Sequence, residues 1–173
     1  CVRVCASLLF NSPDPTTQLV SNPSTTFINL KRFLGVDSAA EARRLAQELL
    51  LPFEVKETGE EGGSWGFVVP AGEESAEEPE RVYTLHELLA LTFHYVQKLA
   101  TKAAGDPVKD AVLTVPSSFS QQQRRAFAEA AEVGGLKVLS LISEAGAAAV
   151  HYGLTRRPFD GKEKRNVLLY DAG

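Results

Sequence analysis

The sequence contains no methionine, only two cysteines and a single tryptophan. Because position 1 is not methionine either, we expect an internal segment of a longer chain or a processed product. Cys1 and Cys5 are too few for a disulfide framework, and no nearby histidine completes a zinc site with them. These absences exclude a disulfide-rich scaffold and leave the compartment undecided.

Charge and hydrophobic run length exclude two classes of partner. The formal net charge is -4, and the basic residues are spread along the chain instead of forming a stripe, so we expect no nucleic acid partner. The longest apolar runs, such as residues 5–10, are far shorter than the roughly 20 residues that span a bilayer, so we expect no membrane insertion. A hydrophobic content of 44% over 173 residues fits one substantial core or a large part of a two-lobed domain.

Hydrophobic periodicity and capping residues predict alternating helices and strands. The expected helices are residues 22–34, 38–49, the segment from the capping box at Thr84 to the break at Gly105, 120–133, and 144–152. The expected strands are residues 53–57, 65–69, 81–83, 111–115, 137–141 and 166–170. Strand 111–115 is a continuous apolar run, which is typical of a strand buried on both faces of a sheet. Gly35, Gly134 and Gly153 are expected to end helices, and residues 73–80 and 155–164 to be polar connectors.

The last quarter of the chain ends in Asp171-Ala172-Gly173, directly after an expected strand. A strand followed by Asp and Gly is a common way to hold a carboxylate beside a phosphate or a metal ion, because glycine lets the backbone approach closely. By itself, Asp171 is somewhat more often a turn former. Lys31 in a last helical turn and Glu144 at a helix start are likewise more often residues that favour the helix dipole. The residues alone leave both interpretations open.

Three segments resemble the seventy-kilodalton heat-shock (DnaK-type) chaperone family. They are Asn22-Pro-Ser-Thr-Thr-Phe-Ile-Asn-Leu-Lys-Arg-Phe-Leu-Gly35, Asp110-Ala-Val-Leu-Thr-Val-Pro116, and residues 135–154, which include Ser143-Glu-Ala-Gly-Ala-Ala-Ala-Val-His-Tyr-Gly-Leu154. Their order, their spacing and several unusual residue choices agree together, which makes the match more specific than a lone glycine motif.

The ending Asn166-Val-Leu-Leu-Tyr-Asp-Ala-Gly173 is similar to the family's strand before its second phosphate loop. The resemblance covers residues 21–173, with a divergent patch at 59–80. The sequences of residues 106–112 and 136–139 are most similar to the large, endoplasmic-reticulum glucose-regulated (hypoxia up-regulated) branch of the family.

The resemblance implies an α/β fold, a fragment of an actin-like ATPase (ribonuclease H-like) nucleotide-binding domain. Residues 1–20 would be an irregular or divergent N-terminal segment. Residues 21–105 would belong to the outer subdomain, and residues 106–173 to part of the inner subdomain with the start of the second phosphate-loop strand.

The function implied for the full-length protein is that of a chaperone that binds and hydrolyses ATP with Mg²⁺ to drive protein folding. Its partners would be unfolded clients and co-chaperones or a smaller chaperone relative. The implied compartment is the lumen of the endoplasmic reticulum, with the cytoplasm as the alternative. We expect the isolated chain neither to bind ATP or ADP tightly nor to hydrolyse ATP, because phosphate recognition needs backbone amides of the missing loops.

The resemblance also assigns roles to individual residues. Lys31 matches the family's catalytic lysine, which contacts the transferred phosphate and the attacking water. Glu144 matches the glutamate that orients magnesium-bound water. Asp171 matches the aspartate near Mg²⁺, which it holds through water, and Gly173 belongs to the nucleotide-binding loop.

Pro116 and Arg124 match positions that relay the nucleotide state between domains. The sequence departs from the family pattern at two places near these residues. Ala145 and Gly146 follow Glu144, where the family has Pro-Thr, and Ser118 stands where the family has an aromatic residue.

Two other functions remain open. One is a small-molecule kinase of the same actin-like superfamily, and the other is a non-catalytic interaction fragment, which Ala145 and Gly146 favour.

Overall fold

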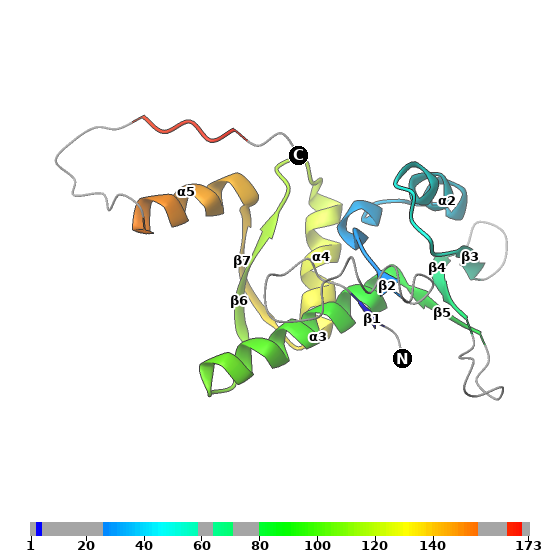
Figure 1. Cartoon of the computed structure of the whole chain (residues 1–173), viewed down its shortest axis with the longest axis horizontal. Helices are drawn as coiled ribbons and strands as arrows, with labels where there is room; N and C mark the ends of the chain where they lie inside the picture. Colours follow the sequence, from blue (N-terminus) through cyan, green and yellow to red (C-terminus); the bar gives the residue numbers. More distant parts are fainter. Residues whose placement is uncertain (1–2, 5–25, 59–63, 71–79, 156–165, 171–173) are drawn as a thin grey trace.

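A computed structural model of the chain describes residues 3–4, 26–58, 64–70, 80–155 and 166–170. These residues form a mixed α/β structure, as predicted, in which an antiparallel sheet and a parallel sheet lie on either side of two packed helices (Figure 1). The two packed helices are α3 (Leu85–Ala104) and α4 (Gln121–Val133). The longer one, α3, runs from the antiparallel sheet past α4.

The antiparallel sheet has the order β3 (Val55–Thr58), β4 (Ser64–Val69), β5 (Arg81–Thr84). Helix α2 (Ala39–Glu48) packs beside it and begins at Ser38, whose hydroxyl accepts the Glu41 N–H. The three strands and this helix confirm the predicted elements to within two residues at most ends.

One exposed ion pair spans this sheet. The Lys56 ammonium of β3 donates to the Glu80 carboxylate just before β5, at 2.5 Å. The hydrogen bond to Glu80 raises the pKa of Lys56 above its ordinary value. The pair joins the ends of two strands that are separated in the sheet by β4.

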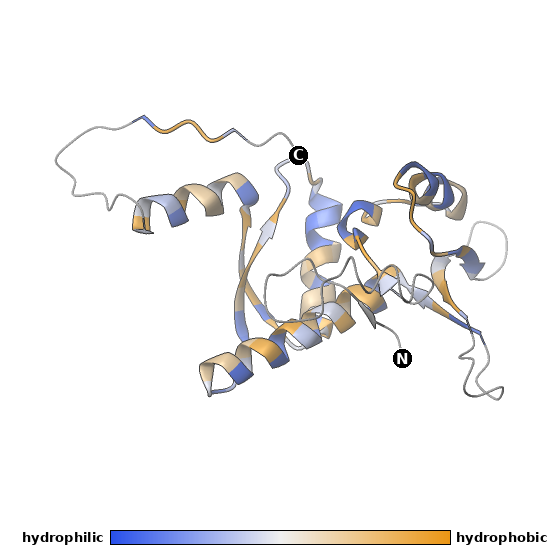
Figure 2. Cartoon of the chain, in the orientation of Figure 1, coloured by the Kyte–Doolittle hydropathy of each residue, from blue (hydrophilic) through white to orange (hydrophobic). Residues whose placement is uncertain are grey.

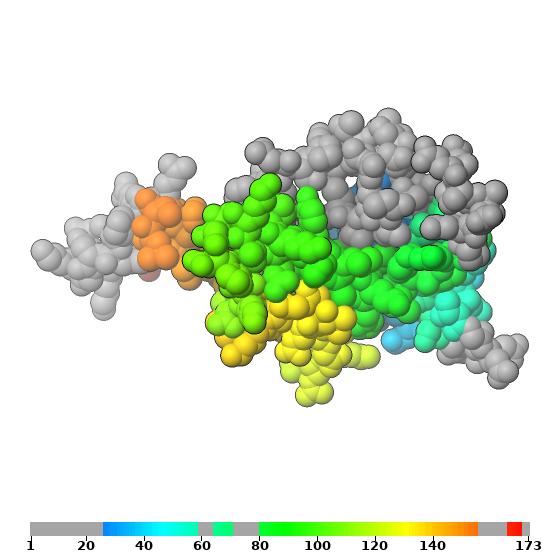
Figure 3. Space-filling view, turned by 90° about the horizontal axis from the view of Figure 1, so that it is seen from below, coloured from blue at the N-terminus to red at the C-terminus, as the bar shows by residue number. Residues whose placement is uncertain are grey.

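Capping boxes start both of the central helices. At α3, Thr84 and Glu87 exchange the two capping hydrogen bonds, as the sequence predicted. At α4 (Gln121–Val133), Ser120 and Gln123 do the same. Such a box satisfies two N–H groups that have no partner within the helix. In the space-filling view, α3 lies directly beside the C-terminal part of α4 (Figure 3).

The parallel sheet consists of β6 (Asp110–Val115) and β7 (Lys137–Ser143), joined through α4. Parallel strands require such a crossover, and a helix is its usual form. Helix α5 (Glu144–Thr155) follows β7 without an intervening loop. Val115 pairs with Ser143, so both strands end at the same level.

The predicted helix 22–34 is wrong over its described part. Residues Thr26–Phe27 form strand β2, which pairs in parallel with β1 (Arg3–Val4), and only Leu30–Phe33 form a short 3-10 helix, η2. Asn29 separates them with a left-handed φ of 57°, a conformation that asparagine tolerates better than most residues. The apolar spacing imitated a helix because strand and turn both point their side chains into the core.

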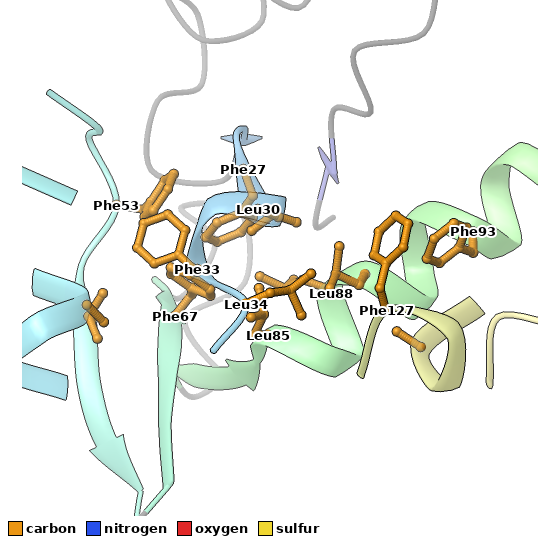
Figure 4. Close-up of a cluster of buried hydrophobic side chains, with 14 of the residues drawn as sticks. Phe27, Leu30, Phe33, Leu34, Phe53, Phe67, Leu85, Leu88, Phe93 and Phe127 are labelled. Carbon is orange, nitrogen blue, oxygen red and sulfur yellow. The ribbon is translucent and has the colours of Figure 1, made fainter. Parts of the chain in front are cut away.

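A single cluster of buried side chains joins the antiparallel sheet to the two central helices (Figure 4). Its members include Phe27, Leu30, Phe33, Leu34, Phe53, Phe67, Leu85, Leu88, Phe93 and Phe127. Four of the aromatic rings, those of Phe27, Phe33, Phe53 and Phe67, lie 5.1 to 6.1 Å apart in tilted or edge-to-face pairs. Such pairs stabilise a core beyond their buried area.

Three further expectations about the second half of the chain are wrong. Strand β6 is not buried on both faces, because its Val112 is 53% exposed. The neighbouring strand β7 is uncovered in the same way, since its Leu139 is 57% exposed. Residues 166–170 do not form a strand, because no described strand lies beside them to accept their hydrogen bonds. Val167, Leu168 and Leu169 are hydrophobic yet exposed, and the middle of this segment is orange in Figure 2. Gly153 does not end α5, which continues to Thr155.

Several predictions lie outside the described residues. They include most of both polar connectors, 73–80 and 155–164, and the turn at 171–173. Among the helices that the structure describes, none is both long and apolar enough to cross a membrane.

Candidate functional site

The candidate site lies where the two parallel strands end. Pro116 directly follows β6, and Glu144 directly follows β7. Because Val115 and Ser143 are paired, these two residues leave the sheet at neighbouring points of its carboxyl edge. Open α/β sheets bind their ligands at this edge.

Lys31 reaches this edge from the 3-10 helix η2. Its ammonium nitrogen Nζ donates to the Thr114 carbonyl oxygen at 3.1 Å and to Glu144 Oε1 at 3.2 Å. Lys31 and Glu144, two of the three residues assigned to catalysis, therefore lie in contact although 113 positions separate them in sequence.

The backbone that carries Lys31 is anchored from two directions. Gln123 of α4 donates from Nε2 to the Leu34 carbonyl at 2.6 Å, and Trp65 of β4 donates from Nε1 to the Val36 carbonyl at 3.0 Å. Both carbonyls follow the short helix within a few residues, so the turn is fixed to the antiparallel sheet and to α4 together. This fixed turn aims the long lysine side chain at the end of β6.

Glu144 is held at the first turn of α5. The Gly146 N–H donates to Ser143 Oγ at 3.0 Å, which caps the helix. A Cβ at position 146 would lie 2.9 Å from that hydroxyl, so glycine leaves room for the cap. A carboxylate in a first helical turn is favoured by the helix dipole. The departure Ala145-Gly146 thus still produces a regular helix start beneath Glu144.

An aromatic ring completes the surroundings of Lys31. The Lys31 Nζ lies 5.1 Å from the ring centroid of Phe127, which is only 4% exposed. An ammonium within about 6 Å of a ring face is attracted by the ring's negative face. The lysine head therefore contacts a carbonyl, a carboxylate and an aromatic ring.

Arg124 and Pro116 lie at one turn beside the site. The Arg124 guanidinium donates from Nε to the Phe119 carbonyl at 3.1 Å and from Nη2 to the Ser117 carbonyl at 3.4 Å. The Phe119 N–H in turn donates to the Pro116 carbonyl at 3.2 Å. Arg124 thus holds the turn that begins with Pro116, which connects the end of β6 to α4.

The remaining assigned residues, Asp171 and Gly173, lie outside the described part of the chain. Within the described part, no group of three or more His, Cys, Asp or Glu side chains could hold a metal ion. The assignment of Asp171 to water-mediated Mg²⁺ binding and of Gly173 to the nucleotide loop therefore stays a prediction.

Sequence reasoning missed two contacts of Lys31. The Thr114 contact uses a backbone carbonyl, for which a sequence carries no signal. Phe127 did carry one, since it is the only aromatic residue in a helix otherwise made of alanine, valine and polar residues. An isolated ring in such a helix indicates a specific contact, but its partner could not be named without the fold.

The arrangement suits a ligand that carries both phosphate and a hydrated cation. An ammonium stabilises negative charge on a phosphoryl group, and a nearby carboxylate accepts hydrogen bonds from metal-bound water. The Lys31 and Glu144 side chains are 39% and 43% exposed, and such an exposed ion pair contributes little stability. A phosphate can therefore replace Glu144 as the partner of Lys31 at small cost.

Comparison with known proteins identifies the family of the chain. The family model described as Hsp70 protein matches residues 14–173, which is nearly the whole chain. The chain belongs to the Hsp70 family. This is the family that the sequence resembled, and its nucleotide-binding domain has an actin-like ATPase fold, with which the mixed α/β structure is consistent.

Curated Hsp70 relatives fall into two groups. Hypoxia up-regulated protein 1 of Danio rerio is 45% identical over 94 residues, which cover 54% of this chain and 10% of that protein. The Xenopus laevis protein of the same name is 45% identical over 91 residues, 53% of this chain and 14% of that protein. The putative heat shock 70 kDa protein 7 of Homo sapiens is 38% identical over 157 residues, 91% of this chain and 40% of that protein. The chain thus spans less than half the length of these relatives.

Proposed function

We infer that this chain is a segment of the nucleotide-binding domain of an ATP-dependent Hsp70 chaperone, and that Lys31 and Glu144 face the terminal phosphate of the nucleotide. The single observation that supports this most is the contact of the Lys31 ammonium with Glu144 and with the Thr114 carbonyl at the end of β6. The Hsp70 match over residues 14–173 supplies the family context.

Each residue then has a defined task. Lys31 places a compact positive charge where negative charge moves during phosphoryl transfer. Glu144 would hold and orient water bound to the cation, because its carboxylate lies 3.2 Å from the ammonium that would bind the same phosphate. Bound Mg²⁺ and ATP would supply the neutralised phosphates and the leaving group. Asp171 is proposed to hold Mg²⁺ through water, and Gly173 to belong to the second phosphate loop.

The proposal includes a division of the chain. Residues 21–105 would be part of the outer subdomain and residues 106–173 part of the inner subdomain of a ribonuclease H-like fold. Residues 1–20 would be a divergent N-terminal segment. Arg124 and Pro116 would transmit the nucleotide state from the site, since both lie on the turn that begins where β6 ends.

Partners and compartment are proposed from the similarity to the relatives. Hypoxia up-regulated protein 1 and the heat shock 70 kDa relative support unfolded client proteins and co-chaperones, or a smaller chaperone relative, as partners of the full-length protein. The similarity to hypoxia up-regulated proteins favours the lumen of the endoplasmic reticulum, and the similarity to the human relative keeps the cytoplasm as the alternative.

Substitution of Lys31 in the full-length protein tests the proposed function. In single-turnover assays, Lys31→Ala should lower the rate of ATP hydrolysis by at least about 100-fold, since electrostatic groups at the reacting phosphate contribute on this scale. Glu144→Gln should lower the rate as well while retaining nucleotide binding. The measurement is the release of labelled phosphate from a preformed complex of protein and ATP.

Lys98→Ala is the matched control, because it removes the same charge from an exposed position of α3. Its hydrolysis rate should equal that of the unmodified protein. Equal rates for Lys31→Ala and Lys98→Ala would contradict the assignment and favour the non-catalytic interaction fragment, which Ala145 and Gly146 already favour in sequence.

A further inference from the structure

The Lys31 ammonium contacts two hydrogen bond acceptors and one aromatic ring. Its two acceptors, the Thr114 carbonyl and Glu144 Oε1, lie at 3.1 and 3.2 Å. The face of the Phe127 ring lies at 5.1 Å from Nζ and supplies a third contact. A lysine side chain has a flexible four-carbon stem, so the position of its head depends on such contacts.

The Phe127 ring is itself held rigidly. It is 4% exposed and lies between two other rings, with centroid distances of 5.1 Å to Phe93 and 6.4 Å to Phe119, both edge-to-face. Figure 4 shows Phe127 beside Phe93 at the end of the buried cluster. The helix that carries it is fixed to the Lys31 turn through Gln123 and the Leu34 carbonyl. The ring and the lysine backbone therefore keep a constant separation.

The two kinds of contact differ in how they respond to a ligand. Glu144 is 43% exposed, and an arriving phosphate competes with it for the ammonium. The ring of Phe127 is buried and offers no hydrogen bond, so it keeps its contact with Lys31 whether or not the carboxylate has been displaced. The Thr114 carbonyl and the ring face are therefore the two contacts that do not depend on what else the ammonium binds, and the ring is the one that a side chain supplies.

We propose that Phe127 is a positioning residue for Lys31, and that its ring face holds the ammonium at the end of β6 while Lys31 exchanges Glu144 for a phosphate. This assignment rests on the proposed ATPase function for its catalytic consequence. Its structural part, the placement of Lys31 by the ring, is independent of that function. An ammonium over an aromatic face at a partly exposed site shifts an equilibrium by about two- to fivefold.

The test compares three variants of the full-length protein. Phe127→Leu keeps an apolar side chain but removes the ring, and Phe127→Tyr keeps the ring. Phe53→Leu is the matched control, because it removes a buried ring of the same core, and no contact with Lys31 or Phe127 is described for that ring. Thermal unfolding of each variant verifies that it has folded.

The first readout needs no nucleotide. In protein labelled with ¹³C at lysine Cε, the Lys31 methylene protons should be shifted upfield by the ring, and Lys31→Arg identifies their signal. Phe127→Leu should return this signal to the position of an exposed lysine such as Lys98, whereas Phe127→Tyr and Phe53→Leu should leave it shifted. An unshifted Lys31 signal in the unmodified protein, or one unaffected by Phe127→Leu, overturns the proposal.

The second readout is single-turnover ATP hydrolysis. Phe127→Leu should lower the rate constant about two- to fivefold without changing the Kd for Mg-ATP, and Phe127→Tyr should restore the rate. An equal loss in Phe53→Leu would show a purely structural effect and would overturn the positioning role. If the full-length protein hydrolyses no ATP while the Lys31 signal behaves as expected, the proposed function fails and the placement of Lys31 by Phe127 stands.

Discussion

At the scale of single residues, two close contacts matter most for the site and the packing. One is made by a pair of side chains, and the other is possible only because a side chain is absent. Lys31 and Glu144 are distant in sequence but in hydrogen-bond contact. Gly134 permits the second contact. It ends α4 with an ordinary φ of -71°, which any residue can adopt. Glycine is therefore needed here because it has no side chain, and not because of its backbone freedom. A Cβ there would lie 2.6 Å from Phe93 Cβ and 2.7 Å from the Ala90 carbonyl oxygen.

Gly134→Ala should therefore separate α3 from α4 or force their side chains out of place. We expect a loss of about 1–3 kcal/mol in the free energy of unfolding, as for other overpacked cores. Urea denaturation followed by circular dichroism measures it. Val133→Ala, one residue earlier and 79% exposed, is the control and should change stability by less than about 0.5 kcal/mol. Equal stability of Gly134→Ala and the unmodified chain would contradict the described packing of the two helices.

At the scale of elements, α3 connects the two halves of the structure. It begins directly after β5 and carries Leu88 and Phe93 into the shared core. Its capping box at Thr84 and Glu87 fixes where the helix starts and therefore which face it turns toward α4. The sequence pattern predicted this element correctly because caps and apolar spacing are both local signals.

Thr84→Ala should destabilise the fold by about 0.5–2 kcal/mol, because the Glu87 N–H loses the Thr84 hydroxyl that accepts its hydrogen bond. Thr84→Ser retains the hydroxyl and should stay close to the unmodified stability. The comparison uses the midpoint of thermal or urea unfolding for both variants. A Thr84→Ala protein as stable as Thr84→Ser would mean that the box contributes nothing to the start of α3.

At the scale of the whole molecule, the described residues would supply one side of the proposed nucleotide site. They contribute Lys31, Glu144 and the carboxyl edge of β6 and β7, whereas the phosphate-binding amides expected from the family are not among them. Part of the parallel sheet is also uncovered, since Val112 and Leu139 are more than half exposed. Both observations fit a chain that spans only part of its relatives.

The isolated 173-residue chain should therefore show no tight binding of Mg-ATP by isothermal titration calorimetry and no magnesium-dependent ATP hydrolysis. Without backbone amides around the phosphates, Lys31 alone gives too few contacts for high affinity. The full-length protein, titrated under identical conditions, is the positive control. Hydrolysis by the isolated chain that Lys31→Ala abolishes would overturn this expectation.

The sequence by itself determined the features that depend on neighbouring residues. The starts of α2, α3 and α4 and the positions of the strands in the antiparallel sheet follow from caps, turns and apolar periodicity, which act over a few residues. The motif at residues 22–35 was assigned to the right family, but its helix was wrong, because strand β2 and the turn η2 bury the same side chains that a helix would.

Only the tertiary structure decided which distant groups meet. The fold brings Lys31 against the Thr114 carbonyl, Glu144 and the Phe127 ring, contacts made across a sheet edge and a helix interface. It also decided that residues 166–170 stay unpaired, because a strand requires a neighbouring strand and none lies beside them in the described part of the chain. Local patterns determine elements, whereas a site at the ends of parallel strands exists only once the strands have been placed side by side.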